Sequence, residues 1–155
     1  MNCLQDLLTP QRCLCHIQGG SRKRLFEVVA DVLVREQEAF HPTELVAGML
    51  AREKLGCTAL GDGIAIPHCR LADCETASGV LITLATPADF ESPDGEDVDI
   101  IFALVVPLDA TQEHLNLLAD IARMFSQAEF RQALRECRTS EALYTTAINW
   151  AARGA

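Results

Sequence analysis

The stretch VDIIFALVVP, residues 98–107, has the strongest bearing on the fold. It is rich in β-branched residues and ends in a proline, so it predicts a β-strand. Nearly every residue from Ile100 to Val106 is apolar, whereas a strand with one wet face alternates apolar and polar side chains. An unbroken apolar run is typical of a strand that is covered on both faces. We therefore expect an α/β protein in which helices flank both faces of a sheet.

The sequence on either side of this run supports that fold class. The stretch VLITLAT, residues 80–86, predicts a second strand, and residues 87–97 between the two strands predict a polar turn region. Residues 58–68 are rich in glycine and predict short strands and loops. A short first segment ends near Ile17, where Gly19 and Gly20 interrupt it.

Capping residues and apolar spacing predict the helices. We expect them from Ser21 to about Glu38, from His41-Pro42 to near Gly56, from Asp109 or Thr111 to about Ser126, near Glu129 to Glu136, and from Ser140 through Trp150. In the third of these, one apolar face is predicted from Leu115, Leu118, Ala122 and Phe125, which step by 3, 4 and 3 residues.

Length and composition exclude several classes of protein. A chain of 155 residues fits a single domain, here residues 1–155, and its 49% of hydrophobic residues can build a core. No apolar run reaches the roughly 18 residues of a membrane helix, and the N-terminus lacks the features of a signal peptide, so a cytoplasmic protein is expected. Seven cysteines without a signal peptide favour reduced thiols. A net charge of −9 argues against nucleic acid as a partner and is compatible with docking to a basic protein surface.

The stretch GDGIAIPHCRL, residues 61–71, raises the question of function. Pro67 fixes the backbone before His68, and the apolar residues 64–66 can anchor the segment in the core. His68 is then either a core histidine with a satisfied ring or a reactive imidazole on a rigid support at a strand end. His114, near the start of a helix, is either a histidine at the edge of the core or part of an anion site. Arg52 is either solvated or a clamp for a phosphate or carboxylate.

The other two histidines carry less information. His41 is most simply a cap residue before Pro42. His16 follows two cysteines in CLCH, residues 13–16, which could ligate a soft metal. No second ligand cluster with zinc spacing accompanies it, so no metal site is expected.

Two runs, AREKLGCTALGDGIAIPHCRL (51–71) and DVDIIFALVVPLDATQEHLNLLADIARMF (97–125), resemble a known family. They are similar to the IIA components of the bacterial phosphoenolpyruvate:sugar phosphotransferase system, mannitol/fructose class, and most of all to its nitrogen-regulatory branch. The resemblance extends from about residue 4 to residue 150. It implies a single-domain three-layer sandwich with a mixed β-sheet, a bacterial cytoplasmic location and no cofactor.

The resemblance also implies roles for particular residues. The histidine of the P-H motif, here His68, carries the phosphoryl group. Arg52 helps to hold that group, and His114 faces His68 across the site. Thr58 and Gly63 match positions that support the phosphate site. The chemistry is consistent with these residues, because a neutral imidazole is a good nucleophile near neutral pH and phosphoryl transfer depends on positioning and charge.

Three features depart from the family pattern or lie outside it. Cys69 stands where the family usually has glycine, and Cys57 where it often has serine. A side chain at position 69 puts the close approach of a donor protein in doubt and places a thiol next to the nucleophile. Either its oxidation blocks phosphorylation, or the cysteine is a tolerated change to a small residue. The basic residues at 22–24 either bind a partner or form a solvated helix tip.

The expected function is that of a phosphohistidine carrier. An HPr-like phosphocarrier protein would be the donor, and regulatory proteins such as transport regulators or sensor kinases would be the targets. One alternative is a sugar-transport IIA component that passes phosphate to a IIB domain. The other is an interaction module that has lost phosphotransfer, with His68 as a structural residue. The oligomeric state and the reactive ring nitrogen stay open.

Overall fold

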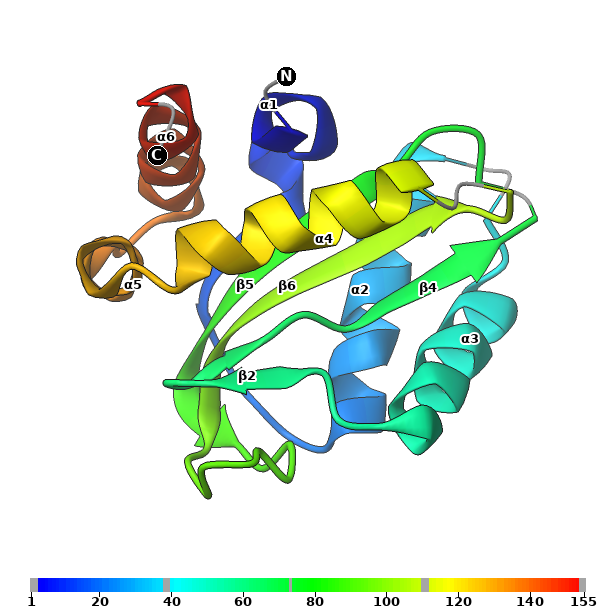
Figure 1. The fold of residues 1–155 in the computed structure, drawn as a ribbon, viewed down its shortest axis with the longest axis horizontal. Coiled ribbons are helices and arrows are strands. Elements are labelled where there is room, and N and C mark those ends of the chain that lie inside the picture. Colours follow the sequence, from blue (N-terminus) through cyan, green and yellow to red (C-terminus); the bar gives the residue numbers. More distant parts are fainter. Residues whose placement is uncertain (1–2, 38–39, 73, 110–111, 154–155) are drawn as a thin grey trace.

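The run at residues 98–107 forms β6 (Val98–Pro107), a central strand of the computed structural model (Figure 1). The structure describes residues 3–37, 40–72, 74–109 and 112–153, without the side chains at positions 3, 113 and 114. Successive side chains of β6 enter two different clusters of buried residues. Ile101, Ala103 and Val105 enter one cluster, and Ile100, Phe102, Leu104 and Val106 enter the other. The unbroken apolar run therefore reflects burial on both faces, as predicted.

The sheet has six strands and is mixed. Its order is β1 (Cys13–Ile17), β5 (Ser78–Ala88), β6, β3 (Ile64–Ala65) and β2 (Ala59–Gly61), and β4 (His68–Leu71) also pairs with β6. β5 and β6 are antiparallel, whereas β3 and β4 run parallel to β6. β1 is parallel to β5 and β2 is antiparallel to β3.

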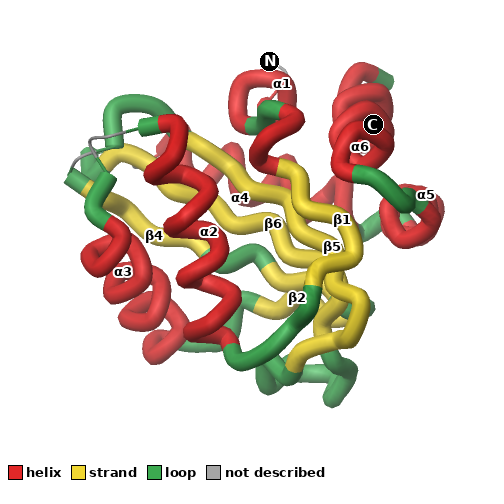
Figure 2. Tube along the Cα trace, turned by 180° about the vertical axis from the view of Figure 1, so that it is seen from behind, coloured by secondary structure: helices red, strands yellow, loops and turns green. Residues whose placement is uncertain are grey.

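Helices cover both faces of this sheet. α2 (Arg22–Glu36) and α3 (Pro42–Leu55) pack on one face, which is toward the viewer in Figure 2. The other face carries α1 (Cys3–Leu7), α4 (Gln112–Phe125), α5 (Ala128–Glu136) and α6 (Ser140–Ala152) (Figure 1), and the short 3-10 helix η1 (Pro10–Arg12) leads into β1. The predicted three-layer sandwich is therefore confirmed.

Several local expectations are refined. The Ser21 side chain accepts a hydrogen bond from the Arg24 amide at 3.1 Å, as a cap residue does. His41 is the residue before α3, but its side chain does not make the capping hydrogen bond. The cap of α6 was predicted one residue too late: Thr139, not Ser140, accepts from the Ala142 amide at 3.0 Å.

Two further expectations need correction. β5 continues to Ala88, so the start of the predicted turn region at 87–97 is part of a strand. Leu115 was predicted on the buried face of α4, yet it is 57% exposed because α4 meets the sheet through later turns such as that of Ile121 and Phe125. Thr111, one of the two predicted caps of α4, lies outside the described residues. No helix in the described ranges combines the length and the apolar character that crossing a bilayer requires.

Candidate functional site

The backbone around His68 is held firmly by the central strand. Residues 64–66 are buried, with at most 4% of each residue exposed. The Pro67 carbonyl accepts a hydrogen bond from the Leu104 amide at 2.9 Å, and His68 pairs with Leu104 in the parallel ladder of β4 and β6. The half-buried imidazole therefore projects from a strand whose backbone cannot shift without breaking the sheet.

The hydrogen bonds of the ring fix its tautomer. Nδ1 of His68 lies 2.8 Å from the carbonyl oxygen of Ile66, and a carbonyl oxygen can only accept. Nδ1 therefore carries the hydrogen of the neutral ring, and the lone pair is on Nε2. Nε of Arg52 donates to Nε2 at 3.3 Å. The nitrogen that carries the lone pair and a guanidinium are thus already in contact.

The surroundings of His68 lower its pKa below the ordinary value of 6.5. Burial is the main cause, because it disfavours the charged ring, and the cations Arg52 and Arg70 act in the same direction. The hydrogen bond to the Ile66 carbonyl and the carboxylate of Glu53 act in the opposite direction. The net effect keeps the imidazole neutral and nucleophilic at neutral pH.

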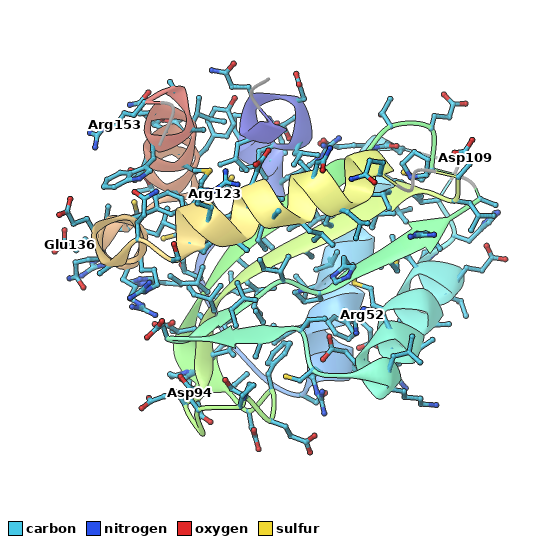
Figure 3. All side chains as sticks on the ribbon, viewed as in Figure 1. Arg52, Asp94, Asp109, Arg123, Glu136 and Arg153 are labelled. Atoms are coloured by element: carbon cyan, nitrogen blue, oxygen red, sulfur yellow. The ribbon has the colours of Figure 1, made fainter. Side chains whose placement is uncertain are left out.

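Arg52 reaches the ring from the last turn of α3, on the other side of the β4 strand from α4 (Figure 3). Its Nη1 donates to the Gly56 carbonyl at 2.8 Å, which orients the guanidinium plane. Arg52 and His68 line one pocket of about 320 Å³. Its other walls come from the β2 region and from α4: Cys57, Thr58, Ala59, Leu60, Ile66, Leu118, Ala119 and Ala122.

Thr58 lines this pocket, and it introduces a residue that the sequence reasoning missed. Its hydroxyl donates to the carboxylate of Glu53, whose side chain is only 5% exposed. The same carboxylate pairs with Arg22 at 3.1 Å. Arg22 therefore links α2 to α3. Because its guanidinium is used in this ion pair, Arg22 does not belong to an exposed basic tip at residues 22–24 that could bind a partner. The signal for Glu53 was its place beside Arg52 in the run REKLG.

Gly63 is not in this pocket. It has a φ of +81°, and a Cβ there would lie 2.6 Å from Nη2 of Arg135 and 2.7 Å from Oδ1 of Asp99. It lines a different, mainly acidic pocket of about 710 Å³. The glycine is required by the backbone conformation and by the close Arg135–Asp99 ion pair, whose shortest distance is 2.9 Å. The structure thus brings Arg52, Thr58 and His68 together but does not bring Gly63 to them.

His114 and Cys69 complete the predicted set. His114 belongs to α4, the helix that forms one wall of the pocket, but its side chain is not among those that the structure describes. Cys69 follows His68 in β4, so its side chain points to the opposite face of the sheet. There it is 6% exposed, and a Cβ at Gly48 of α3 would be 3.4 Å from its sulfur.

The position of Cys69 corrects an expectation. Its thiol does not stand beside the imidazole of His68, and burial raises its pKa to about 12. Each described cysteine is a free thiol. Cys57, the other departure, donates to the Phe90 carbonyl at 2.8 Å, as a serine hydroxyl could. In the described part of the chain, no three His, Cys, Asp or Glu side chains are grouped so that they could share a metal ion.

Comparison with known proteins identifies the family. Residues 6–149 match the model of the phosphoenolpyruvate-dependent sugar phosphotransferase system, EIIA 2. The chain belongs to this family. It is thus a phosphotransferase component, a carrier of phosphoryl groups within that system.

Its relatives bear a regulatory name. A nitrogen regulatory protein of Pseudomonas aeruginosa is 44% identical over 146 residues, which cover 94% of this chain and 95% of that protein. The crystal structure of nitrogen regulatory protein IIA-Ntr from Neisseria meningitidis superposes with a TM-score of 0.85 at 38% identity, covering 92% of this chain and 97% of the other.

The likeness in fold extends to a sugar-specific relative. The mannitol IIA enzyme of Escherichia coli, solved in complex with phosphorylated mannitol IIB, has a TM-score of 0.74. The superposition covers 94% of this chain and 97% of the other. At 16% identity this likeness concerns the fold alone.

Proposed function

We propose that this protein is the phosphohistidine carrier of a nitrogen-related phosphotransferase branch and that Nε2 of His68 accepts the phosphoryl group. The observation that carries the proposal is the 2.8 Å contact between Nδ1 and the Ile66 carbonyl, which leaves the lone pair on Nε2. That nitrogen lies at the pocket, next to the Arg52 guanidinium. The lowered pKa of the ring supports the same assignment, because a protonated imidazole cannot attack.

The transfer is an in-line displacement at phosphorus. The Nε2 lone pair forms the new N–P bond while the bond to the donor's histidine nitrogen breaks, and that nitrogen keeps the electron pair. The Ile66 carbonyl holds the proton on Nδ1, and it stabilises the positive charge that the ring gains. Arg52 turns from Nε2 to the phosphoryl oxygens, whose charge it offsets.

Two other residues take supporting parts in this proposal. His114, from the α4 wall, acts as the second histidine that faces the phosphoryl group. Thr58 holds the start of β2 through its hydrogen bond to Glu53; its hydroxyl proton is already committed there. Gly63 acts indirectly: it allows the turn that precedes β3 and does not touch the phosphoryl group.

The donor in this proposal is an HPr-like phosphocarrier protein that docks over the pocket. Exposed leucines lie on three elements near it: Leu55 at the end of α3, Leu60 in β2 and Leu115 in α4, with 85%, 50% and 57% of each residue exposed. Such a rim can be buried against a partner, and the net charge of −9 favours a partner with a basic surface. The chain would act in the bacterial cytoplasm as one domain, residues 1–155 with a core at about 4–150.

The targets of the carrier are regulatory proteins such as transport regulators or sensor kinases, which would distinguish the phosphorylated from the unphosphorylated state. The regulatory name of the relatives supports this part of the proposal. A second candidate is transfer to a IIB domain, which the mannitol complex favours, since that IIA enzyme shares the fold.

The test is incubation with phosphoenolpyruvate, enzyme I and an HPr-like donor. We expect a mass gain of one phosphate that is acid-labile and alkali-stable, absent in His68→Ala and unchanged in His16→Ala. His16 is the matched control because it is exposed on β1, away from the pocket. Absence of the gain with every cognate donor would favour the interaction module. Onward transfer to a purified IIB domain would favour the sugar-transport role.

A further inference from the structure

Glu53 is a buried carboxylate that the phosphoryl-transfer chemistry does not itself require. Its side chain is 5% exposed, less than the 27% of its partner Arg22. A buried carboxylate is costly unless a counter-charge and hydrogen bonds compensate it. Glu53 has both: Oε1 pairs with Nη1 of Arg22 at 3.1 Å, and Oε2 accepts from the Thr58 hydroxyl.

These two contacts link three elements at one point. Arg22 is in the first turn of α2, Glu53 is in the last turn of α3, and Thr58 directly precedes β2. Arg22 is held in addition by Glu91 at 3.5 Å, and its guanidinium lies 5.9 Å from the centre of the Phe90 ring. Glu53 therefore attaches the end of α3 to rigid parts of the fold on two sides.

The residue that this attachment controls is Arg52, the neighbour of Glu53 in the same turn. Last turns of helices fray readily, because their carbonyls lack helical partners. The contact from Arg52 to Nε2 of His68 spans 3.3 Å between α3 and β4, so movement of that turn would break it. We propose that Glu53 is a positioning residue for phosphoryl transfer: it clamps the last turn of α3 so that Arg52 stays at His68. This inference rests on the proposed role of His68.

The chain offers a close control for this clamp. Glu36 has partners of the same residue types as Glu53. It pairs with Arg12 at 3.0 Å and accepts a hydrogen bond from the Thr9 hydroxyl at 3.2 Å. It also joins a helix end, that of α2, to a neighbouring segment, but it is not among the groups that act on His68. Loss of Glu36 therefore measures what a Glu–Arg–Thr cluster contributes to stability alone.

The experiment compares Glu53→Gln, Arg22→Gln and Glu36→Gln with the wild type. Single-turnover phosphoryl uptake at increasing concentrations of a phosphorylated HPr-like donor gives the rate constant at saturating donor, here kcat, and the half-saturating donor concentration, here KM. NMR titration of the imidazole gives the pKa of His68 without any phosphorylation. Among the described residues, the charged groups that act on this pKa are Arg52 and Glu53 from α3 and Arg70 from β4, and the Ile66 carbonyl acts through its hydrogen bond. The described α4 side chains in the pocket wall are apolar.

A clamp predicts that kcat falls roughly tenfold in both Glu53→Gln and Arg22→Gln, with little change in KM, because a misplaced Arg52 affects the transition state. The pKa of His68 should rise in Arg22→Gln, because displacement of Arg52 removes a cation that lowers it. In Glu53→Gln the loss of the carboxylate acts against that rise, and in Glu36→Gln the pKa of His68 should not change. Glu36→Gln should keep the wild-type kcat.

Three results would overturn the inference. Wild-type kcat in Arg22→Gln would mean that the link to α2 does not position Arg52. An equal loss of kcat in Glu36→Gln would mean that the effect is general stability. A rise in KM alone would mean that Glu53 serves docking. If Glu53→Gln does not fold, Arg22→Gln still decides the question, because the glutamine amide can donate to the Glu53 carboxylate, which also keeps its hydrogen bond from Thr58. A wild type that gains no phosphate at His68 would instead refute the proposed function, while the NMR result would stand.

Discussion

Nε of Arg52 donates a hydrogen bond to Nε2 of His68 across 3.3 Å, although the two residues belong to a helix end and a strand. The same guanidinium donates to the Gly56 carbonyl at 2.8 Å. The arginine is thus held by its own helix terminus while it contacts the proposed nucleophile. Because the cation is in place before a phosphoryl group arrives, little reorganisation is needed at the moment of transfer.

Replacing Arg52 by lysine should therefore be costly even though the charge is kept. A lysine ammonium lacks the planar set of donors that serves Gly56 and His68 together. We expect phosphoryl uptake to slow by about a hundredfold, as when one preorganised donor is removed from a transition state. Single-turnover kinetics with a phosphorylated donor would measure it. Arg123→Lys is the control, since Arg123 is 61% exposed and pairs with Asp120 on the surface of α4. Full activity of Arg52→Lys would show that charge alone suffices.

The lowered pKa of His68 predicts two effects of acid. Uptake should persist somewhat below pH 6.5, because the folded protein keeps the ring neutral there, and should fail as the ring becomes protonated. The free energy of unfolding should also decrease as the pH is lowered. The reason is that the unfolded chain, with a histidine pKa of about 6.5, binds this proton more readily than the folded protein does. That contribution is complete above pH 6.5 and is lost as the pH drops toward the folded pKa.

Urea unfolding of the wild type and of His68→Asn at several pH values would measure the stability effect. The wild type should lose more stability than the variant between about pH 7 and pH 5. Parallel pH profiles for the two proteins would contradict the burial of a neutral ring.

Gly63 should matter for stability and not for transfer. Alanine at Gly63 must adopt a φ of +81° and displace Arg135 and Asp99, whereas alanine at Gly95, with a φ of +76°, meets no atom within 4 Å. We expect Gly95→Ala to cost about 1 kcal/mol and Gly63→Ala to cost about 1–3 kcal/mol more in the free energy of unfolding. Denaturant unfolding would compare them. A folded Gly63→Ala that takes up phosphate a hundredfold more slowly would restore its predicted role in the phosphate site.

Cys69 should be inert toward mild oxidants. Its thiol is buried on the face away from the pocket, and its pKa is raised to about 12, so very little thiolate is present at neutral pH. Wild type and Cys69→Ala should therefore take up phosphate at the same rate before and after brief exposure to peroxide. Selective loss of activity in the peroxide-treated wild type would revive the oxidation hypothesis.

The sequence predicted the features that depend on local pattern. The apolar run of β6 indicated a doubly covered strand, Ser21 indicated a helix start, and both were confirmed. The resemblance indicated Arg52 and His68 as site residues. Their separation of 16 residues in the sequence does not by itself predict the contact between them.

Features that depend on distant contacts could not be predicted in this way. Gly63 is constrained by Arg135, which is remote in the sequence, and Glu53 is distinguished by its burial with Arg22. Cys69 required a register argument: as the residue after His68 in β4, it points to the other face of the sheet. Leu115 showed that apolar spacing identifies a helix face without stating which turns meet the sheet.

The central claim is that His68 accepts the phosphoryl group at Nε2 while Nδ1 keeps its proton on the Ile66 carbonyl. NMR spectroscopy of the 15N-labelled protein, phosphorylated by phosphoenolpyruvate, enzyme I and an HPr-like donor, tests it most directly. The account predicts that one histidine changes, that it is His68, and that the coupling to phosphorus is at Nε2. Phosphorus on Nδ1, or on another histidine, would contradict it.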